Sequence, residues 1–113
     1  MLKFGVVAIS AALISAAVFA QELPGDPKAG RAFVVANCRQ CHEVGNGGRL
    51  LSPPKRGPAF RDVANTAATS PLSLRIFLTT NHPTMPNLIL SKKELDDVIS
   101  YILSLRKPAP TRS

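Results

Sequence analysis

The chain has 113 residues, enough for one small domain but too few for a generous hydrophobic core. Its 14 Lys and Arg against 7 Asp and Glu give a net charge of +7, so the basic surface is expected either to meet an acidic partner or to keep the protein in solution. The basic residues are dispersed and form no arginine-rich arm, which argues against a nucleic-acid-binding protein.

Residues 1–20 have the pattern of a secretory signal peptide: Lys3 gives a positive start, residues 4–19 are apolar or small, and Ala20 supplies a small residue for cleavage. Cleavage predicts export to the periplasm, no stable membrane insertion and a mature domain of residues 21–113 with a net charge of +6, because only Lys3 is lost. The alternative is an uncleaved membrane anchor, since the apolar segment through Ala20 has 17 residues, close to the shortest length that spans a bilayer.

A first helix is predicted from Asp26 onward, because Asp suits the N-cap and Pro27 suits the first helical position. Small and apolar residues, Phe33 among them, then recur at helical spacing until the helix runs directly into Cys38. Residues 43–58 are rich in Gly and Pro, which predicts a loop.

Three more helical segments are predicted. Residues 59–64 form a short turn, Ser70 and Pro71 begin a helix, and Ser91 with Glu94 forms a capping box at the start of the last one. A helical apolar stripe follows in the last helix at Leu95, Val98, Ile99, Ile102 and Leu103. No strand signal of comparable quality occurs, so the predicted fold class is all-α.

The sequence Cys38-Arg39-Gln40-Cys41-His42 is C-x-x-C-H, the haem-attachment signature. Two thiols three residues apart can each form a thioether with one vinyl group on the same porphyrin edge. The next side chain, His42, then presents an imidazole nitrogen to the iron. The motif predicts one haem c, bound covalently through Cys38 and Cys41.

Three other interpretations compete for these residues. A disulfide between Cys38 and Cys41 would close only a small loop and would stabilise little. A zinc site would need Cys38, Cys41, His42 and His82, at a spacing unlike that of paired zinc knuckles. A thioredoxin-like redox pair would follow a strand, whereas a helix leads into this motif.

The second axial ligand is predicted to be Met85. Apart from Met1 it is the only methionine, and it lies in a proline-braced loop instead of on an apolar helical face. His82 is the alternative ligand, separated from Met85 by Pro83 and Thr84, and it is otherwise expected to be a surface histidine.

From Gly25 to Arg106 the chain resembles the small class I c-type cytochromes of bacteria. It has their order of parts: a helix, C-x-x-C-H, a Gly-Pro loop, a short helix, a Met loop and a closing amphipathic helix. The resemblance implies a small cytochrome c fold, with three to four helices packed around one covalently attached haem whose iron is bound by His42 and Met85.

The resemblance also implies that Gly30 packs against the last helix near Val98 and Tyr101, and that the carbonyl of the Gly57-Pro58 pair accepts the second ring N–H of His42. The chain has no Trp, so an indole cannot contact a haem propionate. The basic candidates for that contact are Arg49, Lys55, Arg56 and Arg61.

These features predict a periplasmic single-electron carrier and not an enzyme. The carrier is expected to be a monomer. Its Arg39, Lys55 and Arg56 are expected to contact the acidic docking faces of redox proteins. The alternative is a haem c subunit of a dehydrogenase or oxidase complex, which would expose a large apolar patch. The exposed stretches are expected to be charged or proline-rich, which favours the carrier. A gas sensor or peroxidase would need an open iron position, which Met85 would fill.

Overall fold

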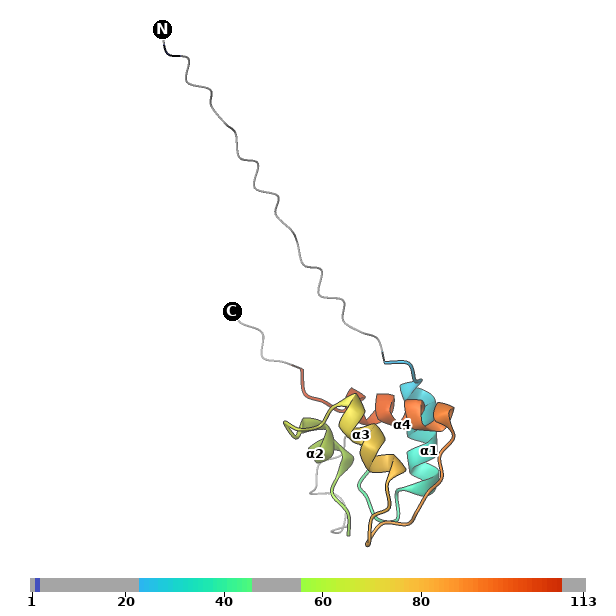
Figure 1. The fold of residues 1–113 in the computed structure, drawn as a ribbon. Helices are drawn as coiled ribbons and strands as arrows, with labels where there is room; N and C mark the ends of the chain where they lie inside the picture. Colours follow the sequence, from blue (N-terminus) through green and yellow to red (C-terminus); the bar gives the residue numbers. More distant parts are fainter. Residues whose placement is uncertain (1, 3–22, 46–55, 109–113) are drawn as a thin grey trace.

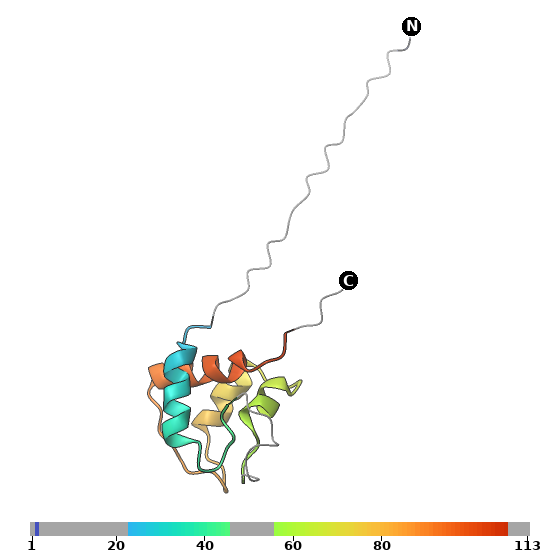
Figure 2. The same cartoon turned by 180° about the vertical axis from the view of Figure 1, so that it is seen from behind.

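The computed structural model describes residues 2, 23–45 and 56–108, which Figures 1 and 2 show from opposite sides. Apart from Leu2, the predicted signal segment lies outside these residues, as do Arg49 and Lys55. The described ranges contain no strand. Their helices are α1 (Pro27–Asn37), α2 (Phe60–Asn65), α3 (Pro71–Thr79) and α4 (Lys92–Ser104).

Helices α1, α3 and α4 begin where local capping signals place them, whereas α2 has no side-chain cap. The side chain of Asp26 accepts the Lys28 N–H at 2.9 Å, which confirms the predicted start of α1. At α4 the Ser91 N–H donates to Glu94 Oε2 at 2.8 Å, and the Glu94 N–H donates to Ser91 Oγ at 3.2 Å. A second capping box, between Ser70 and Ser73, starts α3.

Helices α1 and α4 cross in contact (Figures 1 and 2). A Cβ atom at Gly30 would overlap the backbone carbonyl of Asp97 and lie 2.8 Å from the Cβ of Tyr101, so this crossing requires glycine. The expected contact with Tyr101 is therefore present, and the other nearest atoms belong to the carbonyl group of Asp97, the residue before Val98.

The core surrounds α4, whose residues 95–103 are all buried. Val34 of α1 is 0% exposed and belongs to the same cluster. The Tyr101 hydroxyl donates to the carbonyl of Val44, which ties the chain just after the C-x-x-C-H motif to α4. Just beyond the C-terminal end of α4, Arg106 Nε donates to the Ala64 carbonyl of α2 at 3.1 Å.

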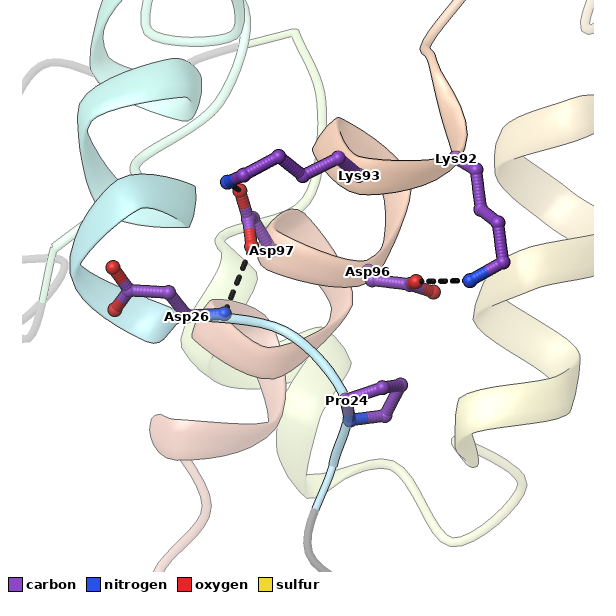
Figure 3. Close-up of a pocket in the computed structure, with 6 residues that line it drawn as sticks. All are labelled: Pro24, Asp26, Lys92, Lys93, Asp96 and Asp97. Atoms are coloured by element: carbon purple, nitrogen blue, oxygen red, sulfur yellow. Dashed lines mark hydrogen bonds and ion pairs between the residues drawn. The ribbon is translucent and has the colours of Figure 1, made fainter.

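A charged cluster fastens the segment before α1 to the start of α4 (Figure 3). Asp97 accepts the Asp26 N–H at 2.8 Å and the Lys93 ammonium at 2.6 Å, while Asp96 accepts Lys92 at 2.8 Å and also Arg75. The bond from Lys93 is the main reason that the pKa of Asp97 is lowered, and the bond from Lys92 does the same for the pKa of Asp96. Both oxygens of each carboxylate accept a hydrogen bond from this chain. The surface hollow that Asp96 and Asp97 line is therefore explained by contacts that hold the fold together.

In the part of the chain that the structure describes, no helix is long and apolar enough to cross a membrane.

Candidate haem site

The two cysteines lie at the C-terminal end of α1. Cys38 is the C-cap residue and its N–H donates to the Val34 carbonyl at 2.8 Å. The Cys38 carbonyl then accepts the N–H groups of Cys41 at 3.2 Å and His42 at 2.9 Å, so the chain turns tightly after α1. Both cysteines are free and half-buried, and burial raises the pKa of the Cys38 thiol.

The imidazole of His42 is held on one nitrogen. Its Nδ1 lies 2.7 Å from the Pro58 carbonyl oxygen, as the resemblance implied. Because a carbonyl can only accept, Nδ1 must carry the proton, and Nε2 is left with a lone pair that can bind a metal. A Cβ at Gly57 would lie 2.6 Å from Nδ1, so the loop can pass this close only as glycine.

Phe60 gives the His42 ring a second support. The two ring centroids are 4.9 Å apart with an angle of 41° between the planes. Phe60 is buried at the start of α2, and its N–H donates to the Glu43 carbonyl at 2.9 Å, which fastens α2 to the segment that follows the motif. The sequence did not point to this role, because Phe60 there belongs only to a short helical turn.

A cavity of about 950 Å³ brings the predicted ligands together. Its lining includes Cys38, Cys41, His42 and Met85, and all four helices contribute residues. Much of the remaining wall is apolar: Phe33, Phe60, Val63, Leu74, Leu78, Leu90, Val98 and Ile102. Two thiols, an imidazole with a free Nε2 and a thioether around one large apolar space form a donor set that fits a haem attached by two thioethers.

His82 lines the same cavity as Met85, and both side chains are half-buried. The His82 ring stacks on Phe77, with centroids 3.7 Å apart and an angle of 28° between the planes. His82 is therefore not a simple surface histidine. In the described ranges, no three His, Cys, Asp or Glu side chains converge in a group that could hold a metal ion.

Of the basic candidates for the propionates, Arg56 lines the cavity and is its only Lys or Arg side chain among the described residues. Arg61, in α2, is not part of the lining.

The chain matches the family described as cytochrome C oxidase, cbb3-type, subunit III over residues 25–102, which include both cysteines, His42 and Met85. It is also similar to cytochrome c-552 from Bradyrhizobium diazoefficiens, with 41% identity over 69 residues. That alignment covers 61% of this chain and 64% of the relative, so it spans a little under two thirds of the relative's length. No solved structure shows a significant match.

Proposed function

The chain belongs to the c-type cytochrome family described as cytochrome C oxidase, cbb3-type, subunit III, with its all-α fold and covalently bound haem c, and we propose that it is a periplasmic one-electron carrier. Export is supported by the signal-like pattern of residues 1–20. In this proposal Cys38 and Cys41 form the two thioethers, and the protein is not an enzyme.

The axial ligands in this proposal are His42 Nε2 and the Met85 thioether. The observation that carries it is that both side chains line the same large cavity as the two cysteines. When bound, the haem supplies an iron that cycles between the ferrous and ferric states. The Pro58 carbonyl fixes the orientation and the tautomer of His42, and apolar side chains form much of the wall around the haem.

Two filled axial positions leave no place for a substrate on the iron, which suits electron transfer and not bond-making chemistry. A thioether ligand raises the reduction potential relative to a second histidine. The proposed carrier therefore works at a higher potential than a cytochrome with two histidine ligands.

We expect the rate of electron transfer to a small anionic oxidant to fall as ionic strength rises, and the rate to a small cationic oxidant to increase. The ferrous protein should be oxidised by anionic hexacyanoferrate(III) at least several-fold more slowly at high salt than at low salt, because salt screens the attraction to the basic surface beyond about 8 Å at physiological ionic strength. Cationic tris(phenanthroline)cobalt(III) should react faster as salt rises. Stopped-flow absorbance measures both rates.

Arg56→Gln, at the cavity, should reduce the salt dependence for hexacyanoferrate(III), whereas Lys107→Gln, beyond the end of α4, is the matched control with the same change of charge. Equal slopes in the two variants would mean that the charge near the haem does not guide docking. If neither rate changed with salt, the net positive charge would serve only to keep the protein in solution.

A second function is favoured by exposed apolar side chains. On α3, Leu72 is 66% exposed and Ile76 is 55% exposed, and Ile89 before α4 is 95% exposed. The expectation that exposed stretches are charged or proline-rich is therefore wrong for α3. Such side chains suit a haem c subunit of an oxidase complex, in line with the family's description.

Gel filtration of a mild detergent extract of the native cells distinguishes the free carrier from the subunit of a complex. A free carrier elutes at the size of a small monomer, whereas a subunit co-elutes with a large complex and loses that association in Leu72→Ser/Ile76→Ser.

A further inference from the structure

His82 is held at the wall of the haem cavity by an aromatic stack. Its ring lies 3.7 Å from that of Phe77, centroid to centroid, at 28°, and both residues line the cavity. Stacking covers one face of the imidazole, while hydrogen bonds of such a ring are made in its plane, from its two nitrogen atoms. The stack therefore fixes the ring without using its polar edge.

Within the described ranges, neither nitrogen of His82 has a hydrogen-bond partner. His42, the other histidine of the chain, differs in this respect, because its Nδ1 donates to the Pro58 carbonyl. A half-buried polar group without a partner is costly unless something outside the protein chain supplies one. At this position that partner is either water or the occupant of the cavity.

Members of the family bind haem, and a haem in this cavity would carry hydrogen-bond acceptors for an imidazole N–H. A haem has two propionate carboxylates, on the edge opposite to the vinyl groups that Cys38 and Cys41 hold. Arg56 is the only Lys or Arg in the described cavity wall, and it adjoins the Gly57-Pro58 segment beside His42. The described wall would thus offer one permanent cation and one unpaired imidazole to the two carboxylates of a bound haem.

We propose that His82 donates a hydrogen bond to a haem propionate and is a positioning residue for the haem instead of an iron ligand. This inference rests on the proposed ligation by His42 and Met85. Met85 can serve the iron from the same loop while His82 keeps its stack on Phe77, so the two side chains have separate tasks.

The test compares His82→Ala with His82→Gln, which retains an N–H donor. Loss of the donor leaves the propionate charge less compensated, which favours the ferric state, so His82→Ala should have a lower reduction potential. His82→Gln should restore much of the difference. Asn81→Ala is the control, because Asn81 is exposed and does not line the cavity. The far-red sulfur-to-iron band of the ferric protein should persist in all three variants.

The outcomes separate this inference from the proposed ligation. An unchanged potential in His82→Ala, with the far-red band intact, overturns the propionate contact and leaves Met85 as ligand. Absence of the band from the wild-type ferric protein, with the ferrous iron opened to carbon monoxide by His82→Ala and not by Met85→Ala, would make His82 the iron ligand and overturn both proposals. Should His82→Ala fail to fold, Phe77→Leu tests the same contact by removing the stack, and a potential unchanged from the wild type would again contradict it.

Discussion

A Cys38→Ala/Cys41→Ala double variant purified without haem should not hold the four-helix structure. The haem cavity measures about 950 Å³ and is bordered by all four helices. If collapse removed half of that volume, the remainder would still cost about 11 kcal/mol, at roughly 24 cal/mol per Å³. That equals most or all of the roughly 5–15 kcal/mol by which small domains are stable.

Circular dichroism and amide exchange measure this effect. We expect weak helicity, rapid exchange throughout and no cooperative thermal transition. Gln40→Ala is the matched control, since it changes the residue between the thiols, keeps both of them and should fold with its haem. Native-like helix content with a cooperative transition in the double variant would mean that the protein chain alone specifies the fold.

Met85→Ala should lower the reduction potential by on the order of 0.1 V, within the roughly 0.8 V over which axial ligands set haem potentials. The thioether favours ferrous iron, and Ala provides no replacement ligand. Voltammetry measures the shift, and the far-red sulfur-to-iron band of the ferric protein should disappear with it. Thr84→Ala, beside Met85 in the same cavity wall, is the control and should retain the band.

A Met85→Ala protein with the potential and the band of the wild type would remove Met85 from the iron. The half-buried thioether would then be an ordinary packing residue of the cavity wall.

The parts of the structure that the sequence predicted depend on contacts within a few residues. The Asp26 cap and the Ser91–Glu94 capping box mark helix starts because each is completed within three residues. The C-x-x-C-H motif is equally local, since the turn after α1 is closed by hydrogen bonds to the Cys38 carbonyl.

The parts that were missed depend on long-range packing. The burial of Asp97 in α4 follows from its bond to the Asp26 N–H, 71 residues away in sequence, and a charged residue in a helix gives no sign of it. Phe77 looks like one more member of an apolar stripe, yet its ring holds His82. Nothing in the sequence around Leu72 and Ile76 indicates that these two apolar side chains of α3 are exposed.

The central claim, that both axial positions of a covalently bound haem are filled, is tested most directly by the absorption spectrum of the purified ferrous protein before and after carbon monoxide is added. Carbon monoxide binds ferrous haem only where an axial position is open. We expect the spectrum of a six-coordinate c-type haem that does not change when the gas is added. A carbon monoxide adduct formed readily by the native protein would contradict it.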